Sequence, residues 1–263
     1  MADEPLTAIA LAGGRLERDF CDAGYDAANK AYLSIGGVLM LERVLSALRG
    51  ASSVAHIRCV TQPDAFHAAF GSRGTALCDE VVASGDGLID SMIAGFAGLP
   101  DDRLVLVVAT DIPLLRSSDV DAFAARVRTV PCDVAYGFVR REPHEARYPN
   151  VRHTWVHLRE GTFCGGGISA IRAGAVAGLA NALRRIVAAR KSPLRLAAIF
   201  SPGLLVRYLF GRLSIADAER RADAIASCRC RGIACEEPEL AVNVDRLADL
   251  QAVARILDEQ KKA

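Results

Sequence analysis

The sequence has almost no excess of charge of either sign, with 32 Lys and Arg residues against 31 Asp and Glu residues. Proteins that hold a long nucleic acid usually carry a surplus of basic residues, so this balance predicts no nucleic acid partner. No apolar run approaches the roughly 20 residues that a helix needs to cross a bilayer. The acidic start, MADEP, lacks the basic flank and apolar core of a secretory signal. We therefore expect a cytoplasmic protein.

Two familiar nucleotide-binding motifs are also absent, the P-loop pattern G-x-x-x-x-G-K-[ST] and the pattern G-x-G-x-x-G. The eight cysteines suggest reduced, mostly buried thiols rather than a disulfide framework. Cys228, Cys230 and Cys235 lie close together, but no second ligand pair with the spacing of a zinc site follows. We therefore interpret these three residues as ordinary cysteines near a turn rather than as a metal site.

The chain is long and apolar enough for a sizeable core, with 263 residues of which 51% are hydrophobic, and one domain spanning 1–263 is expected. Short apolar segments alternate with helical patterns, which is typical of an α/β fold whose parallel strands are covered by helices on both faces. The predicted helices are 40–50 and 88–100, with another at the C-terminal end. The predicted strands are 7–12, 56–62, 80–84, 103–111 and 132–139.

The pattern changes near residue 174, and we predict a helical insertion over 174–230. Its apolar piece, 193–213, is hydrophobic on nearly every side, so it is expected to be buried within the fold. A homodimer contact or a membrane-surface contact are the alternatives. The same region carries a basic cluster that is either a solvated helix face or a clamp for an acceptor phosphate, formed by Arg184, Arg185, Arg190, Lys191 and Arg195.

The first predicted strand ends abruptly in Gly13 and Gly14, in "TAIALAGG". In open α/β sheets ligands bind beyond the carboxyl ends of the strands, where a glycine turn exposes N–H groups to phosphate oxygens. A long polar loop then leads to Lys30, in "NKAYLSIGG". The functional interpretation is a loop that covers phosphates, with Lys30 as a point charge. A surface loop with a solvated lysine explains the spacing equally well.

Two aspartates follow β-type runs, Asp111 in "LVLVVATDIPLL" and Asp245 in "AVNVDRLADL". A carboxylate at the mouth of a buried strand is costly unless it is paired or holds a cation, and a hard divalent metal would remove that cost. The alternatives are a turn cap for Asp111 and a helix N-cap for Asp245. Asp249 is better explained by its favourable place in the first turn of a helix.

Together these pieces resemble the MobA-like NTP transferases, the nucleotidyltransferases related to molybdenum-cofactor guanylyltransferase. The matching motifs are "LAGG" (11–14), "NKAYLSIGGVLMLERVLSAL" (29–48), "ATDIPLL" (109–115) and "NVDRLADL" (243–250). The resemblance implies a three-layer α/β sandwich with a mixed, mostly parallel sheet, as in type A nucleotide-diphospho-sugar transferases. It implies transfer of NMP from an NTP, CTP or GTP, to a small phosphorylated acceptor with release of pyrophosphate.

The resemblance also implies roles for single residues. Leu11, Ala12, Gly13 and Gly14 would bind the nucleotide, Lys30 the phosphates, and Asp111 and Asp245 a Mg²⁺ ion. The segment "GDGLIDS", with Gly85, Gly87 and Ser91, would contact the base or the ribose. Lys30, Asp111 and Asp245 are accordingly the expected catalytic residues.

The sequence departs from the family pattern in two places. The loop before Lys30 is longer than in better-known members, and "FCGGG" stands where a related branch has "FTGGN", so Gly167 lacks that asparagine's amide. A catalytically silent nucleotide-binding regulator is therefore an alternative. A glycosyltransferase that uses an NDP-sugar is another, although the D-x-D motif expected of many such enzymes does not directly follow the strand predicted to end near residue 110. His144, His153 and His157 are expected to be surface residues without a catalytic role.

Overall fold

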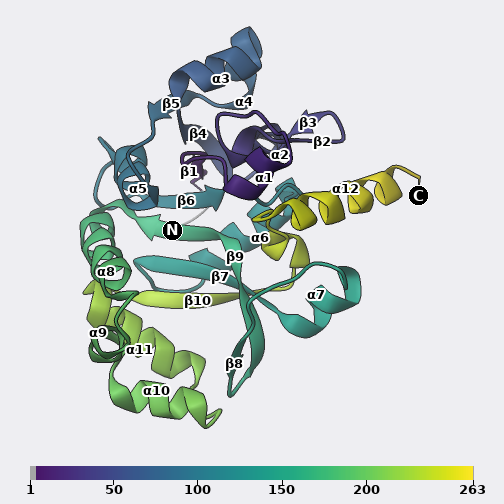
Figure 1. Ribbon diagram of the computed structural model, residues 1–263. Helices are drawn as coiled ribbons and strands as arrows, with labels where there is room; N and C mark the ends of the chain where they lie inside the picture. The colour runs from purple at the N-terminus through teal and green to yellow at the C-terminus, as the bar shows by residue number, and fades with distance from the viewer. Residues whose placement is uncertain (1–3, 263) are drawn as a thin grey trace.

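The computed structural model describes residues 4–262, with the side chains of all of these except 193, 194, 197 and 262; residues 1–3 of the acidic start and residue 263 lie outside the described residues. Eight strands form one mixed sheet, seven of them in the order β10-β7-β9-β6-β1-β4-β5, while β8 pairs with β9 at one side (Figure 1). The strands are β1 (Leu6–Leu11), β4 (Val54–Thr61), β5 (Glu80–Ala83), β6 (Leu104–Ala109), β7 (Val134–Arg140), β8 (Val156–Leu158), β9 (Gly161–Arg172) and β10 (Cys230–Cys235).

Most neighbouring strands are parallel. β1 lies parallel to both β4 and β6, β4 to β5, and β7 to β10, whereas β9 runs antiparallel to β6, β7 and β8. The carboxyl ends of β1 and β6 therefore meet at the same edge of the sheet, where the residues after them can form one site. A separate two-stranded sheet joins β2 (Ser34–Ile35) to β3 (Val38–Leu39).

Helices cover both faces of the sheet, which gives three layers. One face is covered by α2 (Met40–Gly50) and α6 (Ser117–Arg128), and the other by α5 (Leu88–Phe96), α8 (Val176–Ala189) and α11 (Ile215–Ala226). A hydrophobic core fills each interface, because the strands alternate their side chains between the two faces. A third cluster packs α12 (Leu247–Lys262) against α1 (Arg18–Asp22) and β2.

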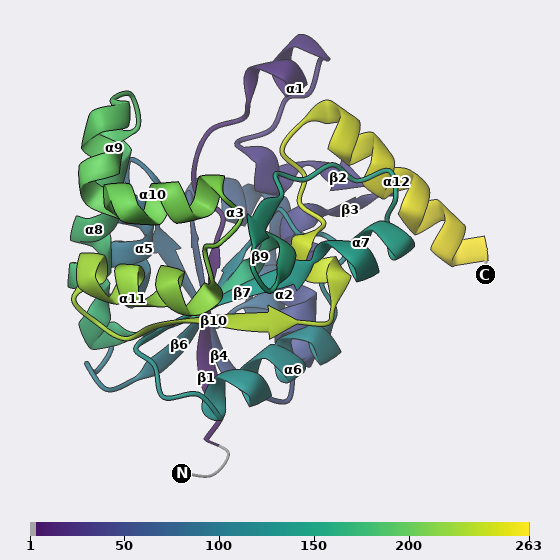
Figure 2. The same cartoon turned by 90° about the horizontal axis from the view of Figure 1, so that it is seen from below.

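The remaining helices are short or lie at the edges. They are η1 (Lys30–Tyr32), α3 (Pro63–Phe70), η2 (Gly71–Arg73), α4 (Gly74–Leu77), α7 (Arg141–Arg147), η3 (Ala173–Ala175), α9 (Pro193–Phe200), α10 (Pro202–Leu209) and η4 (Pro238–Ala241). Figure 2 shows α8 to α11 gathered on one side of the molecule and α12 projecting on the other.

The predicted fold class is confirmed, and so are the five predicted strands, with their ends shifted by one or two residues. The helix predicted over 40–50 agrees with α2, and the one predicted over 88–100 ends early at Phe96, before Gly98 takes a φ of 75°. The antiparallel strand β9 was not predicted, because its central glycines hide the alternation of a strand. The edge strand β10, which contains two of the clustered cysteines, was missed as well.

The apolar piece 193–213 differs from the expectation of burial within the fold. It forms α9, α10 and the turn that follows. Val206 and Leu209 of α10 are exposed to 51% and 78%, and Phe210, directly after the helix, is exposed to 74%. Four helices, α8 to α11, do occupy the stretch between β9 and β10. Their description as an insertion into a single domain stays a prediction.

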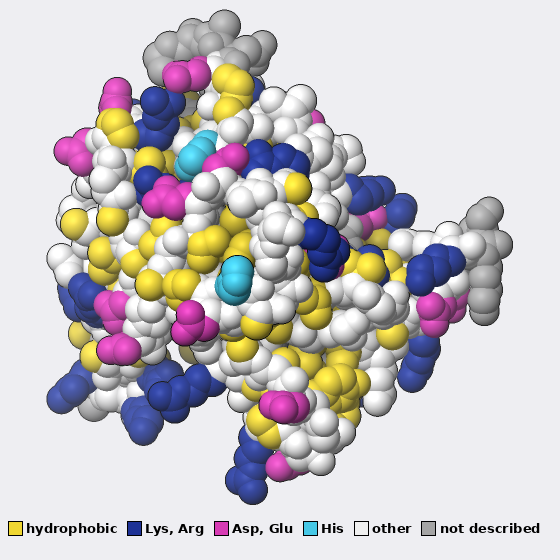
Figure 3. Space-filling model, turned by 90° about the horizontal axis from the view of Figure 1, so that it is seen from above, with side chains coloured by type: hydrophobic (Ala, Val, Ile, Leu, Met, Phe, Trp, Pro, Cys, Tyr) yellow, Lys and Arg dark blue, Asp and Glu magenta, His cyan; other side chains and the backbone are white. Residues whose placement is uncertain are grey.

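Charged side chains of both signs are spread over the face that carries α3 and α4, and a group of basic side chains gathers at its lower left edge (Figure 3). Within residues 4–262, no helix has the length and apolar character that crossing a membrane requires. All eight cysteines are free, and six of them are buried, as the sequence predicted.

Candidate active site

The glycine turn follows β1 at the expected edge of the sheet. The backbone of Gly14 has a φ of 109°, a conformation that side chains rarely adopt. Gly13 is confined in another way, because a Cβ there would lie 2.9 Å from Ser84 Cβ and 3.1 Å from Ser91 Oγ. Only glycines therefore allow this turn to fold so close to the segment that follows β5.

The buried side chain of Asn29 ties the glycine turn to the lysine loop. Its amide donates to the carbonyl oxygen of Ala12 at 2.9 Å and to Gln62 Oε1 at 2.8 Å, while its own oxygen accepts from Ala31 N at 2.9 Å. Thr61 Oγ1 also donates to Ala12 O, at 3.0 Å. The position of Lys30 is thus fixed relative to the end of β1 by its neighbour in sequence, a role that the sequence analysis did not assign.

Lys30 bridges the two predicted aspartates. Its Nζ lies 2.9 Å from Asp111 Oδ2 and 2.8 Å from Asp245 Oδ1, and Glu17 Oε1 is farther away at 3.7 Å. The lysine side chain is 17% exposed, against 23% for Asp111 and 54% for Asp245. Three residues far apart in sequence thus converge at one sheet edge.

The backbone explains why the two aspartates meet. Asp111 follows β6, and its carbonyl oxygen accepts from Val244 N at 2.8 Å, so the segment before α12 is held against the end of that strand. The carboxylate of Asp245 accepts from Lys30 and from Asn243 Nδ2, and no contact of its side chain caps α12. Asp249 instead accepts from the backbone N–H groups of residues 245 and 246, in the first turn where the sequence placed it.

The charges around Lys30 keep it protonated. Burial by itself would lower the pKa of the ammonium, but the negative charge of Asp111 and the hydrogen bonds to both aspartates outweigh burial and raise the pKa well above its usual value. Lys30 is therefore a fixed positive charge at neutral pH.

The third predicted binding segment lies beside the glycine turn. Ser91, in the first turn of α5, is buried, and its Oγ accepts from Gly85 N at 3.1 Å. A Cβ on Gly85 would meet Asp90 Cβ at 2.5 Å, whereas one on Gly87 would point into open space. Gly13, Gly85 and Ser91 are thus brought together. The backbone oxygens of Leu11 and Ala12 are already engaged by Thr110 and by Asn29.

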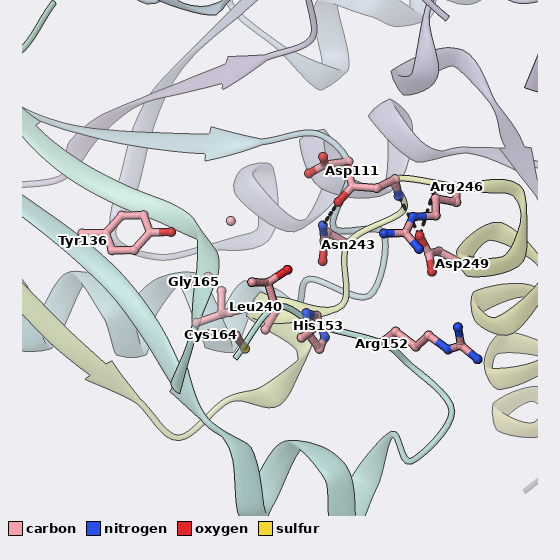
Figure 4. Close-up of a pocket in the computed structure, with 15 residues that line it drawn as sticks. Asp111, Tyr136, Arg152, His153, Cys164, Gly165, Leu240, Asn243, Arg246 and Asp249 are labelled. Carbon is pink, nitrogen blue, oxygen red and sulfur yellow. Dashed lines mark hydrogen bonds between the residues drawn. The ribbon is translucent and has the colours of Figure 1, made fainter. Parts of the chain in front are cut away.

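A cavity of about 480 Å³ opens on the other side of the aspartates. In Figure 4, Asp111, Asn243 and Arg246 lie at one end of this cavity and Tyr136 at the other, with Cys164 and Gly165 between them. Neither Lys30 nor the glycine turn lines it. The two aspartates therefore contact Lys30 on one side and line this cavity on the other.

Two arginines that the sequence analysis did not single out line the cavity, Arg152 and Arg246. Both side chains are exposed, and within the described chain neither guanidinium has a carboxylate partner. The basic cluster that was considered as a phosphate clamp lies elsewhere, on α8, on α9 and in the stretch between them, and does not line the cavity. Within that cluster Arg184 pairs with Asp90 at 2.8 Å.

Gly167 also lines the cavity, and the structure explains the missing side chain. A Cβ at this position would lie 2.7 Å from Ile112 Cγ2 and 2.9 Å from its Cδ1. The fully buried Ile112 thus fills the space that an asparagine would need. An amide is nevertheless present, because Asn243 lines the same cavity and donates to Asp245.

The histidines differ from the expectation of surface positions. His144 on α7 is fully buried, and its Nε2 lies 2.9 Å from His153 Nε2. Burial, with a smaller contribution from His153, lowers the pKa of His144 to about 4, and burial also lowers the pKa of His153. His153 lines the cavity, whereas His157 is exposed, as predicted.

The aspartate pair suits a magnesium ion. Both carboxylates already converge on one cation, the ammonium of Lys30. No cluster of three or more His, Cys, Asp or Glu side chains able to hold a metal occurs in residues 4–262. Mg²⁺ does not need such a cage, since it commonly binds one or two carboxylates and completes its shell with water and phosphate oxygens.

Comparison with known proteins places this geometry in a family. Residues 8–160 match the family model described as the MobA-like NTP transferase domain, a range that contains the glycine turn, Lys30 and Asp111. The resemblance noted from the motifs is thereby confirmed. No protein with a curated description matches the sequence.

Several solved structures are similar over nearly the whole chain. A hypothetical transferase from Thermus thermophilus is 30% identical, with a TM-score of 0.78 over 94% of this chain and 100% of that one. A CMP:2-keto-3-deoxy-manno-octonic acid synthetase solved with CTP is 16% identical, with a TM-score of 0.60 over 98% and 99% of the two chains. A 4-diphosphocytidyl-2C-methyl-D-erythritol synthase from Anaerococcus prevotii is 11% identical, with a TM-score of 0.58 over 98% and 100%. The last two likenesses concern the fold alone.

Proposed function

The chain belongs to the MobA-like NTP transferase family, and we propose that it transfers NMP from CTP or GTP to a small phosphorylated acceptor and releases pyrophosphate. The observation that carries this proposal is the convergence of Lys30, Asp111 and Asp245 between the glycine turn and the cavity. A charged cluster with a glycine turn suited to phosphates near it and a cavity beside it suits a reaction that joins two phosphorylated molecules.

The triphosphate would lie on the side of the glycine turn. Backbone N–H groups that follow β1 suit phosphate oxygens, and Lys30 supplies a positive charge next to them. The base or ribose would contact the segment of Gly85, Gly87 and Ser91, which packs against Gly13. Two of the similar structures are named for CMP or cytidyl products, which favours CTP as the first nucleotide to test.

The acceptor would occupy the cavity, where Arg152 and Arg246 can bind its phosphate through charge-assisted hydrogen bonds. An oxygen of that phosphate attacks the α-phosphorus of the NTP, the bond between the α-phosphorus and its bridging oxygen breaks, and pyrophosphate leaves. Such transfers need positioning and charge neutralisation rather than a side-chain nucleophile. The two arginines and Lys30 supply both.

Asp111 and Asp245 would hold the magnesium ion. When bound, that ion neutralises phosphate charge and polarises the reacting phosphorus. Since Lys30 pairs with the same two carboxylates, it would exchange these partners for phosphate oxygens when the nucleotide binds. Asn243 positions the carboxylate of Asp245 through the hydrogen bond that its amide donates.

Release of pyrophosphate tests the proposal. The protein is incubated with each of the four NTPs, Mg²⁺ and pooled phosphorylated acceptors, beside the variants Asp245→Asn and Asp258→Asn. We expect release with the wild type and with Asp258→Asn, whose exposed residue lies on the far part of α12, and none with Asp245→Asn. NTP binding without release for any acceptor would instead support a silent regulator, and release of NDP from an NDP-sugar would support a glycosyltransferase.

A further inference from the structure

A second cavity, apolar in character, lies next to the first. It measures about 270 Å³, is open to solvent on one side and is lined by β7, β8, β9, β10 and α11. Its walls include Val134 and Phe138 of β7, Val156 of β8, and Ala218 and Ala222 of α11. The two alanines lie one helical turn apart on the face of α11 that covers the sheet, and their small side chains leave the space open.

The two cavities adjoin each other, since Tyr136, Cys164 and Gly165 line both of them. Tyr136 stands between them, and the residue is 52% exposed although β7 has a neighbouring strand on each side. A Cβ on Gly165 would lie 1.9 Å from Tyr136 Oη, so only a glycine at 165 leaves the tyrosine in this position. In Figure 4, Tyr136 stands at the end of the polar cavity opposite Asp111 and Arg246.

The charged groups around the apolar cavity are already engaged. Glu219 Oε1 accepts from Gly232 N at 2.8 Å, and Arg231 pairs with Asp223 at 3.0 Å. Both groups thus already have partners within the fold, and the rest of the lining is mainly apolar. The aspartates, Arg152 and Arg246 all line the other cavity, so one of the two neighbouring cavities is charged and the other is apolar.

We propose that the acceptor is an amphipathic phosphomonoester. Its phosphate lies between Arg152, Arg246 and the aspartates, and an apolar group on its alcohol part passes Tyr136 into the cavity under α11. This inference rests on the proposed function, because only the proposed reaction makes the neighbouring polar cavity the binding site of an acceptor. With a purely polar sugar phosphate, the apolar cavity would stay filled with water. An alkyl or similar group would fill the cavity instead, and the burial of its apolar surface would stabilise the complex.

Binding of simple alkyl phosphates tests the inference without turnover. Ethyl, butyl and hexyl phosphate are titrated into the full chain by calorimetry, in the absence of nucleotide. We expect the Kd to fall about fourfold for each added methylene, the ratio that corresponds to roughly 0.8 kcal/mol per buried methylene, until the cavity is full. Equal affinity for ethyl and hexyl phosphate in the wild type would overturn the inference.

Variants locate the binding site of the alkyl chain. Ala222→Phe should fill the cavity and remove the dependence on chain length, while Ala216→Phe, on the exposed side of the same helix, should keep it. Val156→Ser removes part of the apolar wall, so it should weaken the binding of hexyl phosphate and leave the binding of ethyl phosphate unchanged. Because Val156 is 41% exposed, the variant should remain folded. A chain-length dependence that survives both Ala222→Phe and Val156→Ser would place the alkyl group elsewhere and overturn the assignment.

Failure of this inference differs from failure of the proposed function. If the enzyme releases pyrophosphate with sugar phosphates but binds alkyl phosphates equally at every length, the function stands and the acceptor class is wrong. If affinity rises with chain length but no NTP ever yields pyrophosphate, the apolar site stands and the transferase reaction is wrong.

Discussion

Lys30 Nζ lies 2.9 Å from Asp111 Oδ2, although the two residues are 81 positions apart in the chain. The lysine also pairs with Asp245, so its ammonium holds two acidic side chains together. Without a cation between them, the two carboxylates would repel each other at short range. Lys30 therefore occupies the place where a metal-bound triphosphate is proposed to act.

Replacing Lys30 by methionine should lower turnover about 100- to 1000-fold, the usual effect of removing one charge-stabilising donor from an active site. The matched control is Lys191→Met, which changes an exposed lysine between α8 and α9. Steady-state kinetics of pyrophosphate release measure both variants. A Lys30→Met enzyme as active as Lys191→Met would remove Lys30 from the proposed mechanism.

Replacing Asn29 by alanine should lower the free energy of unfolding by about 2 kcal/mol, because the variant loses three hydrogen bonds of a buried amide and leaves polar partners unpaired. The affinity for NTP should fall as well, since Asn29 joins the lysine loop to the glycine turn. Urea unfolding and nucleotide titration give the two values. If stability falls but NTP affinity is unchanged, Asn29 supports the fold without positioning Lys30.

Adding a side chain at Gly167 should destabilise the protein by about 1–3 kcal/mol, the usual cost of overpacking a core. The cause is the close approach of the new Cβ, which would lie 2.7 Å from Ile112 Cγ2. The double variant Gly167→Ala with Ile112→Ala should therefore be more stable than the sum of the two single changes predicts. Thermal or urea unfolding of the four proteins completes the cycle. Simple additivity would show that Ile112 is not the obstacle.

The stability of the protein should fall as the pH drops from 6.5 to 4. His144 has a pKa lowered from 6.5 to about 4, first by burial and then by His153, while Glu145 opposes the shift. The unfolded chain therefore binds the proton more readily, and stability that is fully present above pH 6.5 is lost as the pH falls through the lowered pKa. The loss from His144 amounts to about 3 kcal/mol at most.

The variant His144→Phe should flatten this acid dependence, because a phenyl ring cannot titrate and can still pack against Tyr148 and Trp155. His157→Gln, which changes an exposed histidine, should leave the slope unchanged. Denaturant unfolding between pH 4 and pH 7.5 measures all three proteins. The same slope in His144→Phe and in the wild type would assign the acid sensitivity to other groups.

Most of the fold could be predicted from the sequence, because buried parallel strands such as β6 are continuous apolar runs that end at recognisable breaks. The positions of Lys30, Asp111 and Asp245 could be predicted too, since each follows a strand or a motif with a clear signal. Asn29 and Asn243 stood inside the quoted motifs, but their hydrogen bonds to Ala12 and to Asp245 depend on how the chain folds and are not visible in a local sequence pattern.

The cavities could not be predicted, because they depend on packing between distant elements. Arg152 lies in a segment without periodicity, and Tyr136 has the alternation of an ordinary strand residue. The same holds for α10, whose apolar sequence predicted burial although the fold leaves its end uncovered. Hydrophobicity alone does not tell which apolar surface a fold will cover.

The hydrogen bond from Val244 N to the carbonyl oxygen of Asp111 has a consequence for synthesis on the ribosome. The residues proposed to hold the nucleotide all stand within the first 111 positions, whereas the second carboxylate belongs to a segment near the C-terminal end, which the ribosome makes late. On the proposed function, a molecule without this segment would keep the residues expected to bind NTP and lose one of the two carboxylates expected to hold the metal. Nucleotide chemistry as proposed here would begin only after the entire sheet, including its final edge strand, is in place.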